Sequence, residues 1–171
     1  MAKIDSSKLV SEKARSYFEQ GFNWAEAISL SFKEYFGYES PFLPSLASGL
    51  GAGIGRKGSL CGNFTGSVMV IGMKFGRKDP KDQDSKEKTY KACQLFWDRF
   101  EKEFGSCYCC DIIGCHLDKE EERQRWLAAG GMQKCTDFVE KTARLLFKFL
   151  KENIEVRDHF APIWSIFINK N

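Results

Sequence analysis

The sequence lacks any apolar run long enough to cross a membrane, and its first residues, Met1 to Ser6, form no apolar signal core. It also lacks an excess of charge of one sign, because 26 Lys and Arg residues are mixed with 23 Asp and Glu residues for a formal net charge of +3. Such an even balance gives no basic patch of the kind that binds nucleic acid. We therefore expect a cytoplasmic protein with no membrane span and no nucleic-acid partner.

Cysteine, in contrast, is abundant, with seven residues in a chain of 171. A structural disulfide framework is not expected in the cytoplasm, where thiols are kept reduced. Metal binding or redox chemistry is the better interpretation, although some of the cysteines could simply be small core residues. The length suits one domain with a hydrophobic core of its own.

Hydrophobic periodicity predicts an all-α protein, a single-domain helical bundle of about five to seven helices with a glycine-rich connection. This helical domain with its cysteine motifs is expected over residues 1–153. The C-terminal tail, residues 154–171, is too apolar to remain exposed, and we expect it to pack on the domain or onto a second subunit, as in a homodimer. Its large apolar residues are Phe160, Ile163, Trp164, Ile166, Phe167 and Ile168.

Cap residues mark the first two helices. Ser6 or Ser7 is predicted to cap the first helix, and Asn23 the second. Gly21 and Gly37 are expected to end them, which together predicts a helical hairpin.

A glycine-rich run at residues 47–56 reads Ala-Ser-Gly-Leu-Gly-Ala-Gly-Ile-Gly-Arg. It does not fit a phosphate-binding loop, because no strand-like run precedes it and no Gly-Lys-Ser/Thr follows it. The glycines instead indicate backbone held close to another helix or to a bound cofactor. Residues 59–76 are predicted to form a buried helix with Cys61 at its start, where Gly62 and Gly66 would let another backbone pack closely.

Three further helices are predicted in the second half of the chain. The first carries an apolar stripe that places Cys93 in the core. The second, capped by Asp118, is polar and is expected at the surface. The third has Cys135 near its start. The stripe of the first helix is Tyr90, Cys93, Trp97, Phe100 and Phe104, and that of the third is Cys135, Phe138, Thr142, Leu145 and Phe149.

Four of the cysteines lie in one stretch, Gly105 to His116. This stretch is predicted to be a tight connection that opens a short helix capped by Ser106. A cysteine in the first turn of a helix faces backbone N–H groups and the positive end of the helix dipole, which favours the thiolate. We therefore expect Cys109 to be the most reactive thiol and Cys93 to react slowly. The four cysteines are Cys107, Cys109, Cys110 and Cys115.

Several common cysteine sites do not fit this pattern. Cys107 and Cys110 form a C-x-x-C pair, but a thioredoxin-type site needs a βαβ setting that the sequence does not indicate. A structural zinc site is expected to have a second close pair of ligands, so zinc is not favoured. Asp111, not His, follows Cys110, which excludes haem attachment. Iron–sulfur ligation needs thiolates from several points of the chain, and cysteines at helix starts meet that need. His116, beside a glycine turn, is expected to be a surface residue.

Taken in order, several motifs resemble those of the redox-active C_GCAxxG_C_C protein family. The resemblance covers roughly residues 10–145. In chain order, its motifs are Phe22-Asn23-Trp24-Ala25-Glu26-Ala27, the glycine run 47–56, Cys61-Gly62-Asn63-Phe64-Thr65-Gly66, Phe104-Gly105-Ser106 with Cys109, and Lys134-Cys135 to Val139.

The resemblance implies a helical protein whose four cysteines are redox-active or hold an iron–sulfur cluster. Three of these positions correspond to Cys61, Cys109 and Cys135. Trp24 stands where the family has its first cysteine, and Asn63 replaces the usual alanine. The candidate metal ligands are therefore Cys61, Cys109 and Cys135 with Cys110 as a local thiol, while Cys107 and Cys115 remain alternatives to Cys110. Trp24 and Gly62 are the candidate cofactor-binding residues.

Three functions follow as hypotheses. The first is a small redox protein that holds an iron–sulfur cluster for electron transfer or redox sensing, with an unidentified redox partner. The second is thiol–disulfide chemistry without metal, with Cys109 as the thiolate and Cys110 or Cys135 as its partner. The third is a structural or interaction domain with inert thiols. Zinc, or no cofactor, is the alternative to iron and sulfur. No general acid–base pair or nucleophile triad can be named, so the sequence does not settle whether the chain is an enzyme.

Overall fold

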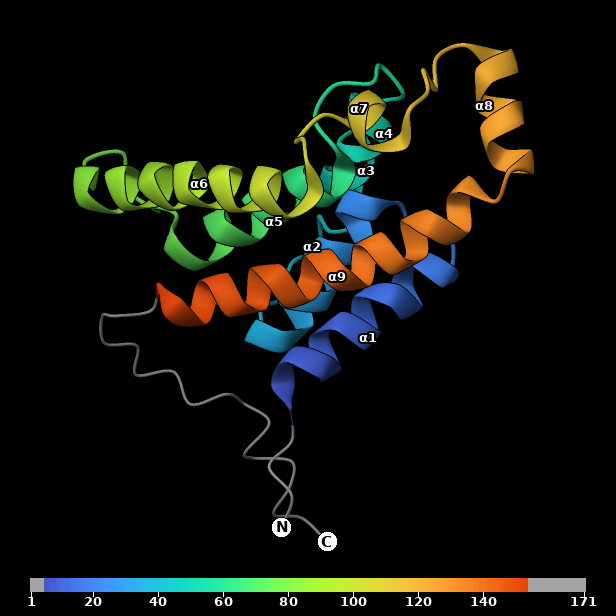
Figure 1. Ribbon diagram of the computed structural model, residues 1–171. Coiled ribbons are helices and arrows are strands. Elements are labelled where there is room, and N and C mark those ends of the chain that lie inside the picture. Colours follow the sequence, from blue (N-terminus) through green and yellow to red (C-terminus); the bar gives the residue numbers. More distant parts are fainter. Residues whose placement is uncertain (1–4, 154–171) are drawn as a thin grey trace, which may run out of the picture.

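The computed structural model describes residues 5–153, and within that range the chain forms nine helices and no strand (Figure 1). Seven of these helices have five residues or more, so the predicted all-α bundle is confirmed. The apolar tail, residues 154–171, lies outside the described residues. The helices are α1 (Ser6–Glu19), α2 (Trp24–Phe36), α3 (Ser45–Ser48), α4 (Gly51–Ile54), α5 (Gly62–Phe75), α6 (Gln83–Phe104), α7 (Cys109–Ile113), α8 (Glu120–Ala128) and α9 (Gly131–Glu152).

The cap of α2 is the one predicted. The Asn23 side chain accepts hydrogen bonds from backbone N–H groups of the first turn. In turn, the Asn23 N–H donates to the Glu26 carboxylate over 2.8 Å. Together these bonds form a capping box, and Gly37 ends the helix in the left-handed conformation. The cap of α1 was predicted wrongly, because the carboxylate of Asp5 accepts from the first N–H groups in place of Ser6 or Ser7.

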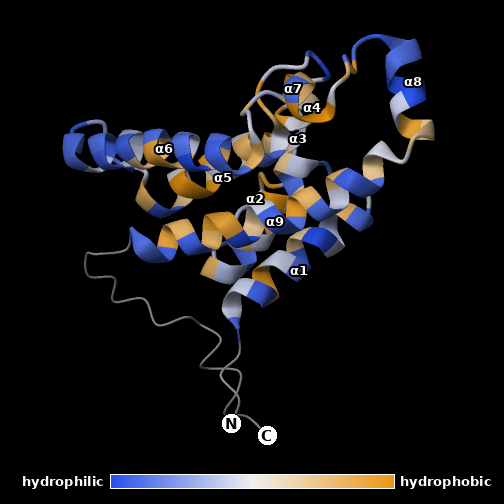
Figure 2. Cartoon of the chain, viewed as in Figure 1, coloured by the Kyte–Doolittle hydropathy of each residue, from blue (hydrophilic) through white to orange (hydrophobic). Residues whose placement is uncertain are grey.

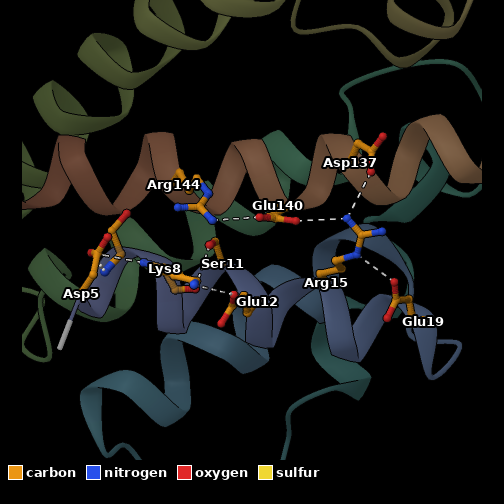
Figure 3. Close-up of polar contacts among 10 residues, drawn as sticks. Asp5, Lys8, Ser11, Glu12, Arg15, Glu19, Asp137, Glu140 and Arg144 are labelled. Atoms are coloured by element: carbon orange, nitrogen blue, oxygen red, sulfur yellow. Dashed lines mark hydrogen bonds and ion pairs between the residues drawn. The ribbon is translucent and has the colours of Figure 1, made fainter.

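Helices α1 and α9 lie side by side, and charged residues line the boundary between them (Figure 3). Arg15 of α1 contacts Asp137 over 3.2 Å and Glu140 over 3.1 Å, both from α9. Glu19 and Arg144 extend the network along each helix at 2.8 and 2.9 Å. We call these five residues the ion-pair seam. In it each charged group has at least one partner of opposite sign.

The core lies between α1, α2, α5, α6 and α9 and is rich in phenylalanine. Phe64 of α5 packs on Phe96 and Phe100 of α6, with ring centroids 6.1 and 5.3 Å apart, and Phe96 also contacts Phe149 of α9 at 5.2 Å. Figure 2 accordingly shows hydrophobic colour along α5 and α9 and mostly hydrophilic colour on α8. The core brings together the starts of α5 and α9, where the cysteines lie.

The core-facing side of α6 differs from the predicted stripe. Ala92, Phe96 and Phe100 are buried, whereas Tyr90 is 56% exposed and Cys93 is half-buried at the edge of the core. The prediction failed because α6 has aromatic residues on two adjacent faces, and periodicity alone does not say which one meets the core.

Helix α8 stands away from the bundle, as expected for a surface helix (Figure 1). None of its residues is buried. Its predicted cap is wrong, since Lys119 occupies the N-cap position and Asp118 pairs with Lys57 over 3.3 Å. Among the residues that the structure describes, no helix has both the length and the apolar character needed to span a membrane.

Candidate functional site

The segments that lead into α5 and α7 run antiparallel and are joined by backbone hydrogen bonds. The Cys61 N–H donates to the Cys107 carbonyl over 2.9 Å, and the Cys109 N–H donates to the Ser59 carbonyl over 2.7 Å. These bonds satisfy N–H groups at the helix starts that would otherwise lack partners. They also hold Cys61 and Cys109 side by side, although 47 residues separate them in the chain.

The glycine-rich connection forms a left-handed turn that presses on Cys109. All five residues from 52 to 56 have φ between +53° and +73°. The left-handed conformation costs an L-residue about 1–2 kcal/mol, and the glycines at alternate positions lower that cost. A Cβ added to Gly53 would lie 2.8 Å from the Cβ of Cys109 and 2.9 Å from the backbone of Gly58. The glycines were predicted to bring backbone close to another helix or to a cofactor. The structure shows the first of these at Gly53, which approaches the start of α7.

Trp24, the first residue of α2, lies against the cysteines. A Cβ added to Gly62 would be 2.9 Å from the Trp24 Cβ, so glycine is required where α2 meets the start of α5. The indole ring contacts Phe18, with centroids 5.4 Å apart, and the Trp24 side chain hydrogen-bonds the thiol of Cys135. Trp24 thus bridges α5 and α9 at the point where the thiols meet.

The structure brings Cys61, Cys109 and Cys135 together from the starts of α5 and α7 and the second turn of α9. Each is more than nine-tenths buried, and each is a free thiol. Burial is the main cause of the raised pKa of Cys61 and of Cys109. Electrostatic interaction with Cys135 adds to both shifts, and Cys61 also adds to that of Cys109, so the three thiols lie within electrostatic range of one another. Within residues 5–153, however, no group of three or more His, Cys, Asp or Glu side chains is arranged to hold a metal ion. We call these three residues the thiol cluster.

Burial dominates the protonation of the thiol cluster. It raises the pKa of Cys61 and of Cys109 to about 12 and that of Cys135 to about 11. Backbone N–H groups of Asn63 and Phe64 act in the opposite direction on the Cys61 pKa, as Trp24 does on the pKa of Cys135. The expectation that a helix start lowers the pKa of Cys109 is wrong, because loss of water around the thiol outweighs the helix dipole. Burial also raises the pKa of Cys93, as expected.

The other three thiols of the 105–116 stretch have different surroundings. Cys107 is fully buried, and its thiol donates to the Trp97 carbonyl over 3.8 Å. Cys110 is half-buried beside Gly58, with its thiol 3.5 Å from a carboxylate oxygen of Asp111. Cys115 is also half-buried, and a charge on it raises the pKa of both Cys109 and Cys135. Of the three, Cys115 is therefore the one that faces two members of the thiol cluster.

Asn63 is a site residue that sequence reasoning did not place. It is fully buried one helical position after Gly62, and among residues 5–153 neither its amide nitrogen nor its amide oxygen has a hydrogen-bond partner. A buried polar group without a partner costs about 1–3 kcal/mol, so such groups are rare and call for an explanation. The signal in the sequence was a polar amide within an apolar run, two residues after the motif cysteine Cys61.

Comparison with known proteins gives one match. A family profile described as "Putative redox-active protein (C_GCAxxG_C_C)" matches residues 22–149, about three quarters of the chain. The matched segment contains Trp24, the glycine-rich turn and all three members of the thiol cluster. No curated protein and no solved structure matches the chain significantly.

Proposed function

We propose, from the premise that this chain belongs to the C_GCAxxG_C_C family of redox-active proteins, that its thiol cluster is a redox centre that holds an iron–sulfur group. The role would be electron transfer or redox sensing. The observation that carries the proposal is the meeting of three buried thiols from the starts of α5 and α7 and the second turn of α9. Iron–sulfur groups are held by thiolates supplied in this way, and the bound group would supply the one-electron chemistry.

The donor set fits such a group in its chemistry. Three sulfurs are soft donors, and the unpartnered amide of Asn63 beside Cys61 is a polar group that a bound occupant would satisfy. The described side chains do not already surround one point, so binding would have to draw the sulfurs together. The residues around the site supply burial that excludes water, and Trp24 hydrogen-bonds Cys135.

Metal binding at this site requires the three thiols to lose their protons. Because the three thiols have pKa values of about 11 to 12, they are protonated at neutral pH. Each must lose its proton to ligate metal, so affinity should rise with pH. Backbone N–H groups of Asn63 and Phe64 favour the charged form of Cys61 and would stabilise it as a ligand.

A fourth donor must come from a local thiol, since Trp24 cannot supply one. Cys107 is engaged with the Trp97 carbonyl, and Cys110 lies beside Gly58. Cys115 influences two members of the thiol cluster, which favours it over Cys110. We therefore extend the candidate ligands to Cys61, Cys109, Cys135 and Cys115, with Cys110 as the alternative.

Metal-free thiol–disulfide exchange is less well supported. The attacking group in such chemistry is a thiolate, and reactive cysteines have lowered pKa values. Here the pKa of every one of the seven thiols is raised, with burial as the leading cause in each case. No thiol is thus set apart as an activated nucleophile.

The test is iron, zinc and sulfide analysis of the protein purified without oxygen, together with its visible absorbance. We expect iron and sulfide in the wild type, their loss in Cys61→Ser, and their retention in Cys93→Ser, whose thiol is at the edge of the core on α6. Cys110→Ser and Cys115→Ser identify the fourth donor by which of them loses iron. Trp24→Cys, which restores the family residue, should increase the iron retained.

Two results would count against the proposal. Iron and sulfide at the level of a protein-free blank, in both wild type and Trp24→Cys, would show that no cluster forms. Equal iron loss in Cys61→Ser and Cys93→Ser would place any bound metal elsewhere. Thiol titration with and without reductant then separates disulfide chemistry from inert thiols.

A further inference from the structure

Two adjoining hollows lie between α7, α8 and the start of α9. The inner one, of about 220 Å³, is lined mainly by apolar side chains from all three helices, and the thiol of Cys135 forms part of its wall. The outer one, of about 400 Å³, includes Cys115 and Arg125. Ile113 and Trp126 line both, so the two form one cleft. Ligand pockets for small molecules have volumes of about 300–1,000 Å³, and the cleft is of that size.

Trp126 determines the shape of this cleft. Its indole ring occupies the space beside the Cα of Gly131, because a Cβ added there would fall 2.1 Å from a ring carbon. No side chain other than that of glycine leaves room for this ring position. The indole thus lines both hollows, and Phe138 and Ile112 contribute to the apolar wall of the inner one.

Two cations at the cleft have no acidic partner. Within residues 5–153, neither Lys134 nor Arg125 forms an ion pair with a carboxylate, whereas every charged residue of the ion-pair seam has a partner of opposite sign. Glu122, the acidic residue of the cleft, is already engaged by Lys119 over 3.0 Å and by the His116 N–H over 2.8 Å. The cleft therefore combines planar apolar walls with uncompensated positive charge.

We propose that this cleft binds a small aromatic molecule that carries an acidic group. The aromatic part would lie against Trp126 and Phe138, where burial of apolar surface supplies most of the binding free energy. The acidic group would face Lys134 and Arg125, which fix its orientation. The proposal does not rest on the iron–sulfur proposal, although Cys135 and Cys115 line the cleft and a bound cluster would change that part of its wall.

The test uses a matched pair of fluorescent probes on the full-length protein as purified. 1-Anilinonaphthalene-8-sulfonate has the aromatic body and an acidic group, whereas N-phenyl-1-naphthylamine has the same body without the sulfonate. We expect the sulfonate to bind more tightly, and Lys134→Ala to raise its Kd about fivefold, the effect of losing one partly exposed charge contact. The Kd of the uncharged probe should change less than about twofold.

Two further variants separate charge from shape. Lys141→Ala removes a lysine from the same helix, away from the cleft, and should leave both Kd values unchanged. Gly131→Ala should weaken both probes, because its methyl group displaces the Trp126 ring; circular dichroism checks that the variant is folded.

The proposal is overturned if neither probe binds, or if the two probes bind equally well. It is also overturned if Lys134→Ala and Lys141→Ala have the same effect. Binding that responds to neither Lys134→Ala nor Gly131→Ala would place the probe elsewhere, for example on the exposed side chains of Phe42 and Leu46. The iron content of the same sample is measured beside the probe titration, so failure here and failure of the redox proposal are distinguishable.

Discussion

The ion-pair seam differs from the region around the thiol cluster, which we call the cysteine end and which comprises the thiol cluster, the left-handed turn at residues 52–56 and Asn63. The two differ in how well their polar groups are satisfied. Along the seam, Arg15 has carboxylate partners on both α1 and α9, and the arginines Arg15 and Arg144 hold the pKa of Glu140 below its usual range. At the cysteine end, backbone is left-handed, an amide is buried without partners, and burial raises the pKa of each thiol. The seam satisfies its polar groups, whereas the cysteine end tolerates unfavourable ones. Unfavourable local arrangements of this kind cluster at functional sites.

The largest expected effect comes from the left-handed turn. Gly53→Ala should lower the free energy of unfolding by about 1–2 kcal/mol through its positive φ and by a further 1–3 kcal/mol or so through contact with Cys109. Gly55→Ala is the matched control, because its φ is +59° but no atom lies within 4 Å of an added Cβ. Urea denaturation of both variants separates the two contributions. Equal losses would mean that Gly53 is not pressed against α7.

A smaller effect should distinguish satisfied from unsatisfied hydroxyls on α9. Thr136 and Thr142 are both buried, but only Thr136 has a partner, the Met132 carbonyl at 3.1 Å. Thr136→Val should lose about 0.5–1.5 kcal/mol of stability, whereas Thr142→Val should be neutral or stabilising by up to about 1 kcal/mol. Thermal unfolding measures the difference. If Thr142→Val destabilises as much as Thr136→Val, the Thr142 hydroxyl has a partner after all.

The smallest expected effect is at the seam itself. Glu140 has a lowered pKa, first through Arg144 and then through Arg15, so it stabilises the fold above its ordinary pKa of 4.5. That contribution is lost as pH falls through the lowered value. Glu140→Gln should therefore cost at most about 1 kcal/mol at pH 7, less at high salt, and nothing in strong acid.

Glu12→Gln is the control for the seam, because Glu12 pairs only with Lys8 and both side chains are more than half exposed. Urea denaturation at several pH values compares the two variants. A Glu140→Gln effect that persists below the lowered pKa would contradict the assigned cause.

Local patterns in the sequence were enough to predict most of the helices. Asn23 and Gly37 mark the ends of α2 because caps are local. In the predicted stripe of α9, Cys135, Thr142 and Phe149 are buried, whereas Phe138 and Leu145 are only half-buried. The face of α6 was misjudged at Tyr90 and Cys93, because two candidate stripes were present and only contacts with α5 and α9 decide between them.

The site was less predictable because contacts between distant residues determine it. The bonds that join Cys61 to Cys107 leave no periodic signal in the chain, and neither does the left-handed turn. The pKa of Cys109 is raised because the thiol is buried. This burial depends on contacts with distant residues such as Gly53, which local sequence patterns do not indicate. The position of Trp24 beside the thiols, in contrast, agrees with the family motif.

The left-handed turn at residues 52–56 also has a consequence for chirality. Inverting the configuration at Cα exchanges the favoured and disfavoured signs of φ, so a D-residue prefers the conformation that Ala52, at φ +53°, adopts as an L-residue. A chemically synthesised chain with D-alanine at position 52 would therefore adopt this turn without the steric conflict of the natural residue. The part of the molecule that lies against Cys109 is thus the part best suited to a mirror-image amino acid.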